Sequence, residues 1–138
     1  MADHIDIVEG AQLPVLERTI ELADMIAYAG ATWDWHRLHY DPAYLAEKRV
    51  PAPVVDGQVF GAYLAEQVLG AFGTRAEIRK LSFRFRSMVF AGETIACHGE
   101  VSTTEPISGG LIVGVAQKIL VGDRVAVAPA FAEVMIHD

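Results

Sequence analysis

The segment from Gln58 to Phe72 constrains the fold more than any other part of this sequence. Its apolar side chains are spaced as in a helix and cover nearly the whole circumference, whereas a surface helix carries a single apolar stripe. Gly73 follows directly and ends the predicted helix. We therefore expect one long helix that is enclosed by other parts of the chain.

Strand-like runs follow this helix. Leu81, Phe83 and Phe85 alternate with basic Arg84 and Arg86, which predicts one apolar face and one basic face. Three further β-rich runs are separated by glycine-containing turns. They cover residues 94–101, 111–121 and 125–136. We expect these four strands to follow one another in meander order.

Shorter elements precede the long helix. Residues 15–22 alternate as in a strand, and residues 24–29 form a predicted helix that Gly30 stops. Asp41-Pro42 starts another helix, which runs to about Lys48. An antiparallel sheet with the long helix laid in its concave face satisfies this order, so the expected class is α+β. A single sheet leaves an edge open, which favours a homodimer or a dimer of dimers.

Composition narrows the possible partners. With 138 residues and 52% apolar residues the chain can form one domain over 1–138 with a sizeable core. The charge of −7 argues against a nucleic-acid partner, and no apolar run is long enough for a membrane span. Residues Met1 to His4 lack the character of a secretory signal, and Cys97 has no second cysteine to pair with. We expect a cytoplasmic protein.

The chemistry is concentrated in residues 33–41, where two histidines and two aspartates are interleaved with aromatic residues. Asp34 and His39 are five residues apart, which would put them on different faces of a helix, so a shared site requires an irregular turn. A carboxylate and an imidazole that converge can activate a water, one taking its proton while the other orients it or donates a proton.

Each of these side chains also has a structural interpretation. Asp34 could bond its own turn, and His39 could be a core histidine satisfied by a carbonyl. Asp41 is best explained as a helix cap, so a metal site formed with His36 and His39 is disfavoured and we expect no metal. Cys97 is best explained as inert packing.

Asp34, His39 and Asp41 resemble the signature of the MaoC-like dehydratases, the (R)-specific enoyl-CoA hydratase group, which have the hotdog fold. The turn Val54-Val55-Asp56-Gly57 resembles that family's apolar-apolar-His-Gly turn, with Asp56 in place of the histidine, and residues 81–93 resemble the strand and turn that follow. The match runs from about residue 13 to the C-terminus. His36-Arg37 replaces the common Asn-Pro, as in the branch similar to 3-hydroxyacyl-thioester dehydratases and mesaconyl-CoA hydratases.

The resemblance implies hydration of a 2-enoyl-CoA or the reverse dehydration, without a cofactor. Asp34 and His39 would hold the water, and the Gly57 amide at the helix start would stabilise the thioester oxygen as it gains charge. Arg84 and Arg86 either form a solvated face or meet the CoA phosphates. The remaining candidates for substrate contact are Trp33, Trp35, His36, Asp56 and Phe60. Two alternatives stay open: a hotdog thioesterase, and a non-catalytic acyl-CoA-binding subunit of a heteromer.

Overall fold

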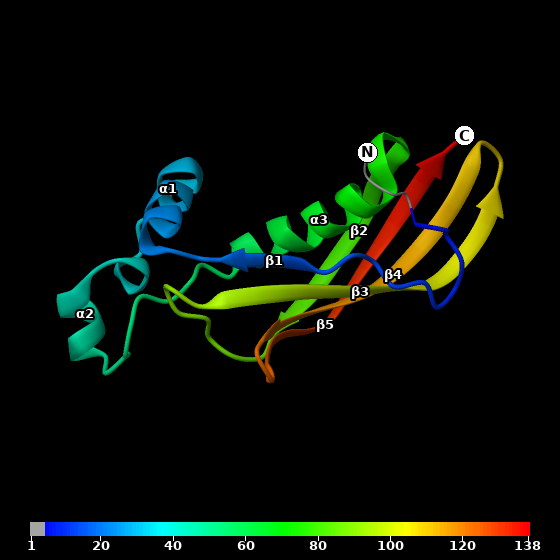
Figure 1. Cartoon of the computed structure of the whole chain (residues 1–138). Coiled ribbons are helices and arrows are strands. Elements are labelled where there is room, and N and C mark those ends of the chain that lie inside the picture. The colour runs from blue at the N-terminus through cyan, green and yellow to red at the C-terminus, as the bar shows by residue number, and fades with distance from the viewer. Residues whose placement is uncertain (1–4) are drawn as a thin grey trace.

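A computed structural model describes residues 5–138; Met1 to His4, on which the expectation about a secretory signal depends, lie outside the described residues. The chain forms a five-stranded antiparallel sheet with one long helix packed on it (Figure 1). The strands are β1 (Leu16–Thr19), β2 (Ala76–Phe85), β3 (Thr94–Ile107), β4 (Gly110–Val121) and β5 (Arg124–His137). The helices are α1 (Leu22–Thr32), α2 (Pro42–Glu47) and α3 (Gln58–Phe72), with 3₁₀ turns η1 (Arg37–His39) and η2 (Gly73–Arg75). This is the expected hotdog arrangement.

The strand order in the sheet is β1-β3-β4-β5-β2. The meander expected for the last four strands is therefore correct for β3, β4 and β5 and wrong for β2. β2 pairs with β5, with Ala76 opposite Ile136, and forms one edge of the sheet, while β1 pairs with β3 at the other edge. Alternating hydropathy identifies a strand but not its neighbour, and α3 carries the chain between the two edges.

α3 is buried along the side that faces the sheet. Phe60, Leu64 and Val68 are almost completely inaccessible to solvent, and the helix packs on β2, β3 and β5. Ala62 and Leu69, on the other side, are exposed. Within this chain, therefore, only one side of the helix is covered, and not the whole circumference as predicted. Burial of several large apolar side chains, each contributing about 1.5–3 kcal/mol, supplies much of the stability of the helix–sheet contact.

The N-terminal elements depart from the predicted limits. β1 is shorter than the predicted strand over residues 15–22, because the chain turns into α1 at Leu22. α1 continues through Gly30, where the predicted helix ended, and stops at Trp33, which adopts a left-handed conformation with φ 57°. Gly30 instead lies against the Trp35 ring, since a Cβ placed there would be 3.7 Å from it. A glycine inside a helix is tolerated when packing favours the longer helix.

α2 follows the prediction closely. Asp41 accepts hydrogen bonds from the backbone N–H groups of Ala43 and Tyr44, so it caps the helix as expected. Arg37 also pairs with Asp41, and that hydrogen bond, together with the cap, holds the pKa of the Asp41 carboxyl below its usual value. Among residues 5–138, no helix has the length and apolar character needed to cross a membrane.

Candidate active site

Asp34 lies in the irregular segment between α1 and η1. Its N–H donates to Ala29 O at 3.1 Å, and its Oδ1 accepts from the N–H of His36 at 3.3 Å. The side chain is half-buried. The chain from Asp34 to His39 is therefore the irregular turn that the spacing of the two residues predicted, and it ends in a single 3₁₀ turn.

His39 is held in one orientation by the segment that leads to α3. Its Nδ1 lies 2.6 Å from Val54 O, and because a carbonyl oxygen can only accept, Nδ1 carries the proton. Nε2 of the neutral ring is then a hydrogen-bond acceptor. The Val54 N–H also donates to Leu38 O at 3.1 Å. Two hydrogen bonds therefore join Val54 to the segment that carries His39.

The two carboxylate oxygens of Asp56 have different surroundings. Oδ1 accepts from the N–H of Gln58 at 3.0 Å, although the N-cap position of α3 belongs to Gly57 and not to Asp56. Oδ2 is buried and has no hydrogen-bond partner among the described residues. A buried carboxylate oxygen without a partner is costly, so its place at a candidate site calls for a ligand, water or proton beside it.

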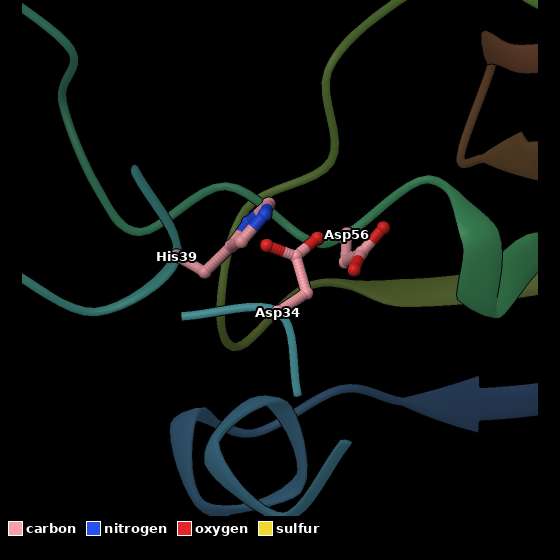
Figure 2. Close-up of side chains that lie close together, drawn as sticks. All are labelled: Asp34, His39 and Asp56. Carbon is pink, nitrogen blue, oxygen red and sulfur yellow. The ribbon is translucent and has the colours of Figure 1, made fainter. Parts of the chain in front are cut away.

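These three side chains converge. Ligand atoms of Asp34, His39 and Asp56 all lie within 4.8 Å of one another. Figure 2 shows the Asp34 carboxylate beside the His39 imidazole, both from the segment between α1 and α2, and Asp56 next to them on the turn that leads into α3. The sequence predicted a pair of Asp34 and His39 and gave Asp56 only as a candidate for substrate contact, because nothing in its spacing ties it to residues 34–39.

The same three groups are all acceptors, so they could also coordinate a divalent cation through two carboxylates and one imidazole. The metal site considered from the sequence, His36 with His39 and Asp41, is a different set. There, Asp41 caps α2 and pairs with Arg37, and His36 Nδ1 accepts from the N–H of Leu38. The absence of a metal from the reaction remains a prediction.

Two cavities flank the turn at Asp56 and Gly57, and Val55 lines both. The first, of about 330 Å³, lies against α1 and the first half of α3 and includes Asp56. The second, of about 380 Å³, lies against the end of β2 and includes His39, Gly57 and Phe60. A bound molecule that reaches from one cavity to the other would pass the carboxylate–imidazole cluster.

Gly57 occupies the N-cap position of α3. Among residues 5–138, no hydrogen bond uses its N–H, as expected at the start of a helix. A Cβ at this position would be 2.4 Å from the Phe85 ring, so only glycine fits under that ring as it stands. As the alternation predicted, Phe85 shares the apolar face of β2 with Phe83, and its ring centroid lies 6.2 Å from that of Phe60 on α3. Because it stands at the end of the strand, Phe85 is nevertheless 59% exposed and lines the second cavity.

Tyr28 is a site residue that the sequence analysis did not identify. It lies on α1 and lines the first cavity. Burial raises its pKa, and the carboxylates of Asp56 and Asp34 raise it further. The Tyr28 hydroxyl therefore stays protonated at neutral pH and offers a donor beside two carboxylates. No motif or spacing in the sequence of α1 distinguishes Tyr28 from its neighbours, so this role could not be predicted.

Of the other residues predicted to contact substrate, some line a cavity and others do not. Trp33 and Trp35 are 80% and 41% exposed, pack edge to face on each other, and line neither of the two cavities. His36 caps η1, and its ring stands 6.0 Å from that of His39. Phe60 and Arg86 line the second cavity, whereas Arg84 is exposed and lines neither.

Cys97 lies on β3 in the core and is fully buried. Burial raises the pKa of its thiol to about 12, so the reactive thiolate is scarce at neutral pH. This agrees with the expectation that Cys97 is inert packing.

A family model described as the MaoC like domain matches residues 6–123. The chain belongs to the MaoC-like dehydratase family. A search of curated protein sequences finds no match for this MaoC-like chain. Among solved structures, it is similar to the (R)-hydratase from A. caviae involved in PHA biosynthesis, with 26% identity and a TM-score of 0.80 over 92% of this chain and 95% of that one.

Two further structures share the fold at lower identity. The R-hydratase PhaJ1 from Pseudomonas aeruginosa has 20% identity and a TM-score of 0.86 over 95% of this chain and 83% of that one. The ChsH1-ChsH2 complex from Mycobacterium tuberculosis has 22% identity and a TM-score of 0.79 over 94% of this chain and 98% of that one. These similarities establish the hotdog fold of this MaoC-like chain.

Proposed function

We propose that this MaoC-like chain is a hydratase/dehydratase that interconverts a 2-enoyl-CoA and a 3-hydroxyacyl-CoA. The observation that carries the proposal is the convergence of Asp34 and His39, both offering acceptors, beside the N-terminus of α3. Membership of the MaoC-like family and the likeness to an (R)-hydratase support the same reaction class.

The proposed reaction starts from one water that donates its two hydrogens to the Asp34 carboxylate and to His39 Nε2. One of these groups takes a proton as the water oxygen bonds to C3, and the electrons of the C2=C3 double bond move toward the thioester carbonyl. The Gly57 N–H donates to that oxygen while it carries enolate charge. The proton then returns to C2 and the carbonyl re-forms, so atoms and charge balance without a cofactor.

The two alternative functions predict different products. A thioesterase would direct the water at the carbonyl carbon and release free CoA thiol. A non-catalytic subunit would bind acyl-CoA and turn nothing over alone. The pairing of Asp34 with His39 favours catalysis, because a purely structural subunit has no need for both groups. A cytoplasmic location is part of the proposal, since a lone cysteine and a CoA ester suit a reducing compartment.

The test uses Asp34→Asn, which keeps the shape but removes the charge, and His39→Ala, which removes the imidazole. A general acid or base contributes about 10²–10⁴-fold, so each variant should lower hydration at least about 100-fold. Because both groups act on one water, the double variant should lose much less than the product of the single losses. The readout is mass-spectrometric detection of 3-hydroxyacyl-CoA from a panel of enoyl-CoA esters.

Matched controls remove the same chemical groups elsewhere. Asp123→Asn changes an exposed turn, and His137→Ala changes an exposed histidine that pairs with Glu77. Both should keep full hydration, and all variants should still bind a saturated acyl-CoA. Near-normal hydration in both Asp34→Asn and His39→Ala would refute the assignment.

A further inference from the structure

The two cavities beside the cluster differ in charge. The first includes the carboxylates of Asp24 and Asp56, and among the described residues no lysine or arginine lines it. The second includes Arg86 and His39 but no carboxylate from the described part of the chain. Since Asp56 and Gly57 are consecutive, a thioester centred on this turn would extend one arm into an acidic cavity and the other into a basic one.

The electrostatic environment of the tyrosines supports this difference. The pKa of Tyr63 in the first cavity is raised by burial and then by the Asp24 carboxylate. At the catalytic end of the same cavity, burial and the carboxylates of Asp56 and Asp34 act on the pKa of Tyr28 in the same direction. Arg18 opposes the effect at Tyr63, but its guanidinium is already paired with Glu66. A second anion in this cavity would therefore be repelled by the two carboxylates that line it.

We propose that the CoA arm lies in the second cavity and the acyl group in the first, and that the first cavity selects uncharged acyl groups against those with a second carboxylate. This inference rests on the proposed function and names its substrate class. The phosphates of CoA suit the cavity that carries Arg86. An acyl carboxylate would lie near the buried Oδ2 of Asp56 and the exposed carboxylate of Asp24, and both negative charges would repel it. The resemblance to mesaconyl-CoA hydratases therefore does not extend to a carboxylated acyl group.

The test compares two substrates of equal chain length, 2-hexenoyl-CoA and 2-hexenedioyl-CoA, which differ only in a terminal carboxylate that is ionised at pH 7.5. We expect kcat/KM to favour the uncharged substrate at least about 100-fold. The preference should shrink as salt rises, because Asp24 is exposed and its charge is screened.

Asp24→Asn is the decisive variant. The Asp24 side chain accepts from the N–H of Glu21 at 2.9 Å at the start of α1, and asparagine can retain that bond while losing the charge. The preference for 2-hexenoyl-CoA should fall about 10-fold in this variant. Asp123→Asn is the matched control, since it makes the same change at an exposed turn that does not line the cavity, and it should leave the ratio unchanged.

A binding measurement separates this inference from the proposed function. Hexanoyl-CoA and adipyl-CoA lack the reacting double bond, and we expect the uncharged ester to bind about 10-fold more tightly by calorimetry. Equal binding of the two esters, or equal turnover of the two enoyl substrates, would overturn the inference and leave the hydratase assignment intact. Absence of turnover with both enoyl substrates, combined with selective binding of hexanoyl-CoA, would overturn the hydratase assignment alone.

Discussion

Asp56 and Gly57 are neighbours in the chain but contribute to the site in different ways. One oxygen of Asp56 accepts from the N–H of Gln58 at the start of α3, and the other is buried with no hydrogen-bond partner in the described part of the chain. The carboxylate lies close to Asp34 and His39. Gly57 contributes only its backbone, and the absence of a side chain leaves room for the Phe85 ring. A single turn thus supplies a carboxylate to one cavity and a backbone donor to the other.

Gly57→Val tests the proposed donor. A Cβ would meet the Phe85 ring at 2.4 Å, and the added methyl groups would obstruct a carbonyl approaching the helix terminus. Loss of one such donor costs about 10²–10³-fold in kcat, which is the decrease we expect in steady-state hydration assays. Since the Phe85 side chain is 59% exposed and can move aside, circular dichroism should show an intact fold.

Phe85→Ala provides the control for displacement of the ring. If Gly57→Val acts only by pushing Phe85 away, the double variant will match Phe85→Ala alone. If it acts by blocking the amide, the double variant will stay at the low rate of Gly57→Val. Normal activity of a folded Gly57→Val protein would rule out the contact between Gly57 and the thioester.

Among the elements, α3 is joined to the sheet by two buried glutamines. Gln67 Nε2 donates to Cys97 O at 2.8 Å and to Pro14 O at 3.1 Å, and its Oε1 accepts from Gln117 Nε2 at 2.9 Å. Gln117 Nε2 also donates to Leu64 O at 3.0 Å. Hydrogen bonds fix direction as well as distance, so this pair holds α3 in one rotation on β3 and β4.

Gln67→Leu should therefore destabilise the fold although leucine is apolar and similar in size. It leaves the buried Cys97 carbonyl and the buried Gln117 amide without this partner, and an unsatisfied buried polar group costs about 1–3 kcal/mol. We expect the free energy of unfolding, measured by urea denaturation, to fall by at least about 2 kcal/mol.

The exposed Gln58, at the first position of α3, is the matched control. Gln58→Leu should change the stability by no more than about 0.5 kcal/mol. The variant with both Gln67→Leu and Gln117→Leu should lose less than the sum of the single changes, because the two side chains bond each other. A Gln67→Leu protein as stable as the parent would show that the network does not hold the helix.

At the scale of the whole molecule, the sheet has two edges of unequal length. β1 spans Leu16–Thr19, whereas β2 spans Ala76–Phe85 and leaves a longer row of backbone groups unpaired within this chain. Phe85 and Met88, at the end of β2 and just beyond it, are more than half exposed. An edge of this length next to exposed apolar side chains favours association with another chain.

We therefore expect a homodimer, or an assembly built from dimers. Light scattering coupled to size-exclusion chromatography should give at least twice the monomer mass of 15.0 kDa at micromolar concentration. A dilution series provides the control, since mass that falls with dilution identifies a weak dimer. A monomer throughout the micromolar range would contradict the prediction.

The sequence by itself determined which segments become helices and strands, because each signal is local. The helix over Gln58–Phe72 follows from the spacing of apolar residues, and α2 follows from Asp41-Pro42. The five-residue separation of Asp34 and His39 predicted an irregular turn between them on the condition that the two share a site. Together with the turn before α3, these local features also pointed to the MaoC-like family.

Only the tertiary structure decided what lies next to what. β2 joins β5 because α3 carries the chain across the sheet, and periodicity contains no information about a strand's neighbour. Asp56 enters the cluster because Val54 hydrogen-bonds to His39 and Leu38. The Phe85 ring meets Gly57 through packing between segments far apart in the chain. Such contacts depend on the packing of the whole molecule, which no local pattern of residues encodes.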